Sequence, residues 1–181
     1  MSALNNRRVA RKVVLLVGIL FIAANLRAPF TGLPPLLESI RADFGLSTIA
    51  TGALTTLPLL AFTLLSPFSA SFSRKLGLEW VLFGALVAIA LGVVLRSAGA
   101  PWTLYVGTWI FGMGIAVGNV LLPSLVKRDF PNSVASVTGA YVLAMGVAAA
   151  LGSAVAIPMA HAWGWSSALV AFLVLPVAAL V

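Results

Sequence analysis

The stretch VVLLVGILFIAANLRAPFTGLPPLL occupies residues 13–37 and carries only one charged side chain, that of Arg27. The run is longer than the about 20 apolar residues that an α-helix needs to cross the hydrocarbon core of a bilayer. It therefore predicts a transmembrane helix with a cation inside it. The first part of this prediction decides the fold, and the second points to the function.

The composition of the whole chain is typical of a membrane protein. Hydrophobic residues make up 61% of the 181 residues and charged residues 8%, whereas soluble domains average about 45–50% and about 25%. We predict an all-α membrane protein, with a basic cytoplasmic tail at residues 1–12 and a six-helix transmembrane domain at residues 13–181. The last apolar segment stops at Val181 without a polar flank, so we expect a fragment whose sixth helix is cut short. The predicted helices cover residues 13–37, 48–72, 80–95, 102–126, 134–160 and 165–181.

The basic residues are distributed unevenly between the two sides of these helices. Of the 11 lysines and arginines, all but three fall on the side of the N-terminus, while Arg41 and Arg96 fall on the other side and Arg27 lies within the membrane. The positive-inside rule then predicts a cytoplasmic N-terminus and a location in the inner (plasma) membrane. The net charge of +7 is explained by topology and leaves no basic patch for a nucleic acid. The basic residues on the N-terminal side are Arg7, Arg8, Arg11, Lys12, Arg74, Lys75, Lys127 and Arg128.

Arg27 lies close to the midpoint of its helix, where an arginine costs about 2.5–3.5 kcal/mol to insert. None of the acidic residues is placed to neutralise it, because all of them fall in predicted loops or at helix ends. We expect Arg27 to face a cavity and to bind an anionic or strongly dipolar solute. The alternative is a structural role, in which neighbouring helices or the missing half of the protein supply a carboxylate or carbonyl partner. The acidic residues are Glu38, Asp43, Glu79 and Asp129.

Helical geometry separates the polar neighbours of Arg27. Thr31 follows one turn later and is expected on the same face, whereas Asn25 is about 200° away and is expected to hydrogen-bond to another helix. Pro29 lacks the N–H that would bond to the Asn25 carbonyl. Transporters use such helix breaks to free backbone groups near the bilayer midplane.

Two later helices carry further candidates. Gly114 and Gly118 form a small-residue motif that we expect to serve helix packing. Asn119 follows one residue later, and its amide could form a structural hydrogen bond as readily as it could bind a ligand. Tyr141 places an aromatic hydroxyl among small residues, and packing in the core is an equally good interpretation of it.

Three segments resemble one branch of a known family. The segments LRAPFTGLPPLL, LTTLPLLAFTLLSPF and GIAVGNVLLPSLVKRDFPNSVASVTGAYVLAMG resemble the cyanate and 2-nitroimidazole transporter (CynX/NimT) branch of the major facilitator superfamily. The stretch ASFSRKLGLE is similar to the superfamily's loop motif at Lys75 and Gly77, but Ala70 replaces its first glycine and Arg74 its aspartate. The resemblance implies the N-terminal half of that fold, with the first, second, fourth and fifth helices along the central path.

We therefore expect a secondary transporter that moves a small anionic or dipolar solute, cyanate-like or nitroimidazole-like, by alternating access. The substrate-binding residues would be Arg27, Thr31, Tyr141 and Asn119, and Asn25, Pro29, Lys75, Gly77, Gly114 and Gly118 would have structural or gating roles. The expected partners are the solute, the bilayer and the missing C-terminal half, with no cofactor and no metal. A self-contained six-helix channel or scaffold and a drug efflux transporter of the same superfamily stay as alternatives. A membrane enzyme is disfavoured because one histidine and no cysteine supply neither an activated nucleophile nor a metal cluster.

Overall fold

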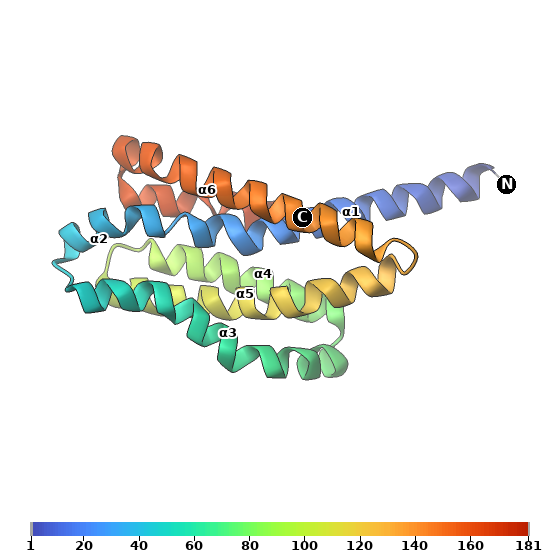
Figure 1. Cartoon of the computed structure of the whole chain (residues 1–181), viewed down its shortest axis with the longest axis horizontal. Coiled ribbons are helices and arrows are strands. Elements are labelled where there is room, and N and C mark those ends of the chain that lie inside the picture. Colours follow the sequence, from blue (N-terminus) through green and yellow to red (C-terminus); the bar gives the residue numbers. More distant parts are fainter. Residues whose placement is uncertain (1, 181) are drawn as a thin grey trace.

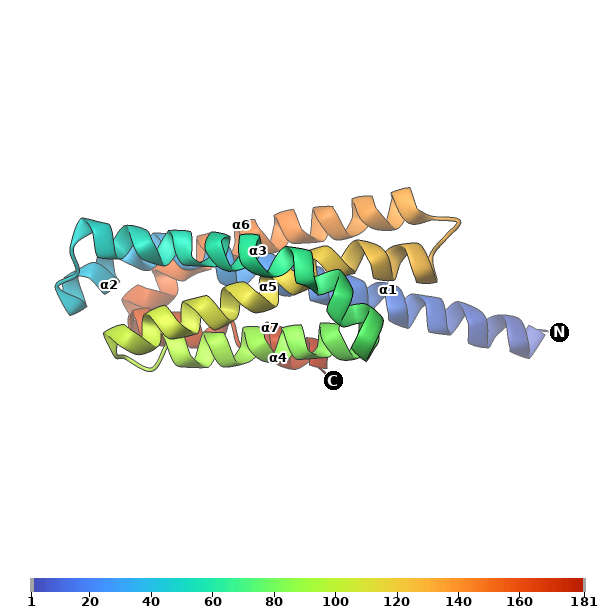
Figure 2. The ribbon, with the colours of Figure 1, turned by 90° about the horizontal axis from the view of Figure 1, so that it is seen from below.

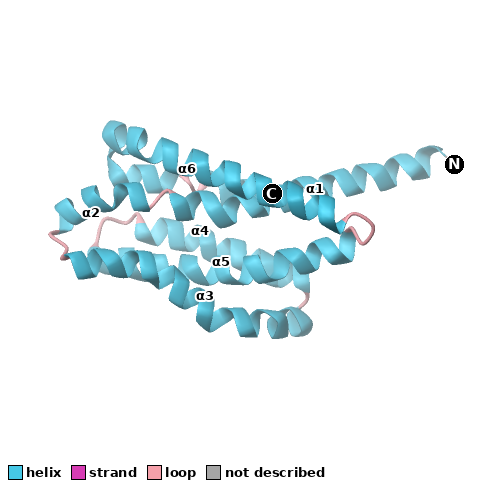
Figure 3. Ribbon diagram, in the orientation of Figure 1, coloured by secondary structure: helices cyan, strands magenta, loops and turns pink. Residues whose placement is uncertain are grey.

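The computed structural model describes the backbone of residues 2–180 and the side chains of residues 10–180. Over this range the chain forms an elongated bundle of helices, joined by short connections at its two ends (Figure 1, Figure 3). The elements are α1 (Ser2–Thr31), the 3₁₀ turn η1 (Pro34–Leu36), α2 (Leu37–Phe44), α3 (Thr48–Leu76), α4 (Leu78–Arg96), α5 (Pro101–Asp129), α6 (Val134–Ala171) and α7 (Val174–Leu180).

Five helical stretches of the described chain are long and apolar enough to cross a membrane. The last of them, Val134–Leu180, counts 47 residues, but Gly164 inside it has φ 82° and ψ 157°, a conformation that essentially only glycine adopts. The chain turns back at this glycine, and the segment after it runs antiparallel to the segment before it (Figure 1). The stretch therefore forms two legs of the bundle, and the predicted all-helical membrane fold is confirmed.

The ends of the predicted helices need correction. The predicted tail at residues 1–12 is already helical from Ser2, and α1 ends at Thr31 rather than at residue 37. Pro34 and Pro35 lack the N–H groups that would continue the helix, so the chain forms η1 and the separate short helix α2 there. The segment predicted as one helix at residues 165–181 is also interrupted between α6 and α7.

Helix α5 lies at the centre of the bundle and packs against both α4 and α3. Glycines allow the closest approaches, because a Cβ atom on Gly107 or Gly114 would overlap the backbone of α4 and one on Gly112 would overlap Pro58 of α3. Gly118 instead faces α1, where a Cβ would lie 2.5 Å from a terminal carbon of Leu26. Small residues let helix backbones approach closely in lipid, where no hydrophobic force drives helices together.

Helix α1 packs mainly against α6, and α7 completes the bundle beside α1 and α4 (Figure 2). Gly152 of α6 lies against Ala28, since an added Cβ would be 2.6 Å from the Ala28 carbonyl oxygen. The backbones of α1 and α6 thus approach each other closely along the part of α1 that contains Arg27.

Helix α3 contains Pro58 and Pro67 and bends away from α5 in its second half (Figure 1). Proline removes a backbone hydrogen bond and kinks a helix at this point. Beyond the bend the large side chains of Leu64, Phe68 and Phe72 are exposed. The bend therefore separates the two ends of α3, so that only the first half packs tightly in the bundle.

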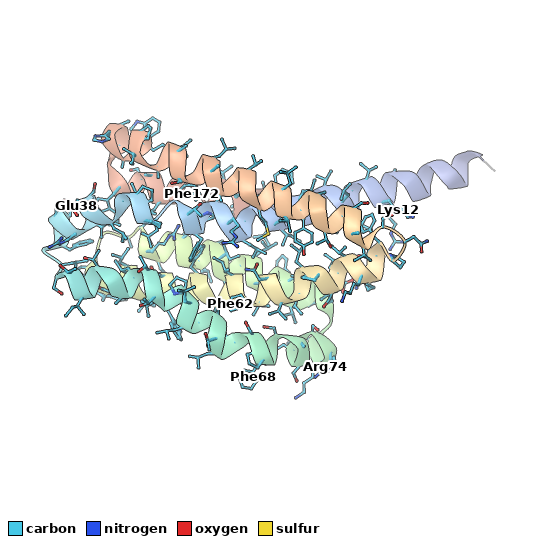
Figure 4. All side chains as sticks on the ribbon, viewed as in Figure 1. Lys12, Glu38, Phe62, Phe68, Arg74 and Phe172 are labelled. Carbon is cyan, nitrogen blue, oxygen red and sulfur yellow. The ribbon has the colours of Figure 1, made fainter. Side chains whose placement is uncertain are left out.

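Most of the charged side chains lie at the two ends of the bundle, whereas Arg27 lies between them. Lys12 and Arg74 lie at one end and Glu38 at the other (Figure 4). At the first end Arg128 forms ion pairs with Glu79, at 2.6 Å, and with Asp129, at 2.9 Å. Basic residues predicted for one side of the membrane thus share one end of the bundle, among them Lys12, Arg74 and Arg128.

Candidate functional site

A cleft of about 290 Å³ lies between α1, α3 and α5. Its wall is apolar except for two side chains, the guanidinium of Arg27 and the amide of Asn119. The apolar lining residues are Leu26, Phe30, Pro58, Leu59, Phe62 and Ile115.

Arg27 reaches the cleft because of its place on α1. Its side chain is exposed, whereas Asn25 on the opposite face of the helix is completely buried. No carboxylate among the described residues forms an ion pair with Arg27. The guanidinium therefore presents its donors and its charge to whatever enters the cleft.

Asn119 is brought to the same cleft by the packing of α5 on α1. Gly118, the residue before it, lies against Leu26, the residue before Arg27. The Asn119 Nδ2 donates a hydrogen bond of 2.9 Å to the Ile115 carbonyl one turn earlier. The carbonyl oxygen of the amide is left as an acceptor, so the cleft combines a strong donor with an acceptor.

Thr31 does not line this cleft, although the one-turn spacing places it close to the Arg27 face. Its hydroxyl lies 2.9 Å from the Ala149 carbonyl oxygen of α6 and 3.2 Å from the Arg27 carbonyl oxygen. The hydroxyl hydrogen bonds of Thr31 are thus made to backbone, and one of them ties α1 to α6.

Tyr141 does not line the cleft either. Its ring is 8% exposed and belongs to the same apolar core as Leu26 and Met145. Tyr141 therefore packs as a core side chain in this part of the protein, and its role in solute binding stays a prediction.

Asn25 makes a contact between helices. Its Nδ2 donates to the Leu175 carbonyl of α7 at 2.9 Å and to the Phe21 carbonyl of its own helix at 2.9 Å. Pro29, in the last turn of α1, is buried. Both residues shape the helix that carries Arg27 and stand apart from the cleft itself.

The remaining candidates lie away from the cleft. Gly114 packs on α4 and Gly118 on α1, so the two glycines serve two different helix contacts. Lys75 is exposed in the last turn of α3, and Gly77 has φ 91° at the junction of α3 and α4.

Phe30 and Phe62 give the cleft aromatic side chains that the sequence argument did not single out. Phe62 comes from the bent middle of α3 (Figure 4). The available signal was Pro58, because a proline within an apolar helix marks a bend, and bends in transporters border the solute path.

The sequence places Arg96 on the side opposite the N-terminus, directly after the helix predicted at residues 80–95. The structure includes Arg96 as the last residue of α4 and buries it completely, at 0% exposed. Its Nη2 donates a 2.9 Å hydrogen bond to the Pro29 carbonyl. The side chain turns into the bundle instead of toward the loop that follows.

Comparison with known proteins assigns the family. The family model of the Major Facilitator Superfamily matches residues 15–181. The chain is 54% identical over 170 residues to the 2-nitroimidazole transporter of Escherichia coli (strain K12), which is 93% of this chain and 43% of that protein. It is 44% identical over 156 residues to an uncharacterized transporter, YycB, of Bacillus subtilis (strain 168), which is 85% of this chain and 39% of that protein.

A more distant relative is the cyanate transport protein CynX of Escherichia coli (strain K12), at 25% identity over 142 residues, 78% of this chain and 37% of that protein. The chain thus spans about two-fifths of the length of these relatives. The matched residues include every residue that lines the cleft. The chain is a multi-pass membrane protein that belongs to the Major Facilitator Superfamily, and it corresponds to about the N-terminal half of that fold.

Proposed function

We propose that this chain is half of a secondary transporter that binds a small, flat, anionic or dipolar solute in the cleft at Arg27. The observation that carries the proposal is an exposed guanidinium near the middle of the apolar span Ala10–Phe44, with no ion pair among the described residues, facing a cleft between three helices. A charge of this kind is costly inside a membrane and is usually retained for function.

The polar groups of the cleft fit a nitro-substituted heteroaromatic ring. A guanidinium offers a planar fork of donors that matches a pair of oxygens on one atom. The Asn119 carbonyl can accept a hydrogen bond from a ring N–H. Phe30 and Phe62 offer apolar surface to the faces of a ring, which a three-atom anion such as cyanate does not need. The 54% identity to a 2-nitroimidazole transporter supports the same choice.

Transport would follow by alternating access, with this six-helix unit and a second unit closing the cleft in turn on either side of the membrane. The described cleft would then be one wall of the binding site. We propose that the N-terminus is cytoplasmic in the plasma membrane, because the basic end of the bundle is the end where α1 begins.

The test uses the full-length parent transporter with Arg27→Lys and Arg27→Ala. Arg41→Ala is the matched control, since Arg41 is an exposed arginine of α2 away from the cleft, where its Nε bonds to the Leu46 carbonyl at 3.3 Å. Uptake of a labelled 2-nitroimidazole is measured in membrane vesicles and divided by the amount of folded protein. Unlabelled cyanate is added as a competitor in parallel.

Arg27→Ala should lower uptake per folded molecule by about 10-fold to 150-fold, the range for about 1.5–3 kcal/mol lost with a charged hydrogen bond. Arg27→Lys should lose less, because it keeps the charge but lacks the fork. Abundance of Arg27→Ala should equal or exceed that of the parent, since an insertion cost is removed. Unchanged uptake per folded molecule would refute the proposal, and low abundance with normal specific uptake would indicate a structural arginine.

A further inference from the structure

The second arginine inside the bundle, Arg96, also forms no ion pair with a carboxylate of the described part of the chain. Its Nη2 bonds to the Pro29 carbonyl, and its guanidinium carbon lies 4.5 Å from the centre of the Phe111 ring. The Nε and Nη1 atoms have no hydrogen-bond partner among the described residues. A cavity of about 30 Å³ adjoins the side chain.

Stability alone does not account for a charge at this position. A guanidinium has five N–H donors, and one carbonyl with one ring face replaces only part of the hydration that burial removes. An apolar side chain of similar volume would fill the same space without that cost. The position of Arg96 is better explained by its hydrogen bond to the Pro29 carbonyl.

Arg96 binds to the C-terminal end of α1. The Pro29 carbonyl lies in the last turn of the helix, where carbonyl groups lack helical partners. Gly32 and Leu33 follow as a turn before η1 begins. A cation at the C-terminal end of a helix is also favoured by the helix dipole. The hydrogen bond therefore keeps in place the end of α1 that Pro34 and Pro35 impose.

The same contact is connected to the cleft at Arg27. Phe30 and Pro58 line both the small cavity beside Arg96 and the cleft. Arg27 itself lies two residues before Pro29 on the helix that Arg96 holds. A shift of the helix end would move Phe30 directly and would change the orientation of Arg27.

We propose that Arg96 is a positioning residue, which holds the broken end of α1 so that Arg27 and Phe30 face the solute. The role rests on the proposed function of Arg27. Loss of Arg96 lowers the fraction of molecules with a competent cleft, and the apparent dissociation constant rises in inverse proportion to that fraction. The maximal rate changes less, because saturating solute restores the competent state.

The test compares Arg96→Met and Arg96→Lys with Ser166→Ala in the full-length parent. Ser166→Ala is the matched control, because its hydroxyl bonds to the Ser97 carbonyl at the same end of the bundle and makes no hydrogen bond to α1 among the described residues. Hydrogen–deuterium exchange of residues 30–37 reports the helix end directly. KM and the maximal rate for 2-nitroimidazole uptake, both per folded molecule, report the cleft.

Arg96→Met should raise exchange at residues 30–37 and raise KM by about 10-fold, the effect of one lost charged hydrogen bond, with the maximal rate within about twofold of the parent. Arg96→Lys keeps a donor and should restore part of both values. If Arg96→Met fails to accumulate, Arg96→Lys alone should still raise KM relative to Ser166→Ala. Combined with Arg27→Lys, Arg96→Met should add less than its separate effect, because both substitutions weaken the same contact.

Three results would overturn the proposal: exchange equal to that of Ser166→Ala, raised exchange with an unchanged KM, or fully additive effects in the double variant. Each of these can occur while Arg27→Lys alone raises KM, so the function proposed for Arg27 would survive. A normal KM in Arg27→Lys and in Arg27→Ala would instead remove that function, and the positioning role with it.

Discussion

Gly107→Ala would perturb a close approach of the α4 and α5 backbones. A Cβ at position 107 would lie 2.3 Å from the Arg96 backbone nitrogen, 2.8 Å from the Gly92 carbonyl oxygen and 2.9 Å from the Arg96 Cα. All three atoms belong to the backbone of α4, so no side chain can rotate away. The added Cβ and the Arg96 nitrogen reach the ordinary contact distance of 3.4 Å only if α4 and α5 move apart by about 1.1 Å.

Overpacking of a tight core typically costs about 1–3 kcal/mol, and we expect the upper part of that range because a whole helix must move. The substitution is made in the full-length parent. The amount of protein in the membrane and the midpoint of heat-induced aggregation in detergent are then measured. The control is Gly84→Ala on α4, where an added Cβ meets nothing within 4 Å and alanine favours the helix.

Gly107→Ala should be less abundant and should aggregate at a lower temperature than Gly84→Ala. Because the shift displaces the Arg96 backbone, any protein that folds should also show a raised KM for the solute. Equal abundance and equal midpoints for the two variants would refute the close approach of α4 and α5.

Three further outcomes follow from other parts of the bundle. Reporter fusions ending after Ser97 or after His161 should report the external side of the membrane, and a cytoplasmic signal at either would contradict the topology. Gly164→Ala should destabilise the protein by about 1–3 kcal/mol, because φ 82° with ψ 157° strains any other residue, and unchanged abundance would refute this. Glu79→Gln should lower the free energy of unfolding by less than about 1 kcal/mol, because the side chains of its ion pair are exposed, Glu79 at 66% and Arg128 at 45%. A large loss of abundance would contradict this expectation.

The helices could be predicted from the sequence because the bilayer imposes a minimum apolar length. The opposite faces of Asn25 and Arg27 followed from helical periodicity alone, and the structure buries the first and exposes the second. The ends were harder to predict, because the hydropathy of residues 32–37 does not reveal that Pro34 and Pro35 stop α1 early.

The site could be predicted only in part. Arg27 stood out because a charge interrupted an apolar run, and Asn119 because an amide followed two glycines. The sequence did not reveal that Thr31 would bond to the Ala149 carbonyl, since that acceptor comes from a helix far along the chain. Arg96 escaped notice because a charge at the end of an apolar run reads as a loop residue unless its tertiary partners are known.

The pairing of α1 with α6 has a consequence for synthesis of the protein. The hydrogen bond from Thr31 to Ala149 joins residues 118 positions apart. At about 5–20 residues per second, the ribosome needs about 6–24 s to make that length of chain. During this interval α1 sits in the membrane with its arginine and without its main neighbour. Substitutions on the α1-facing side of α6 should therefore prolong the period in which newly made chains are open to quality-control proteases, even where the finished protein would tolerate them.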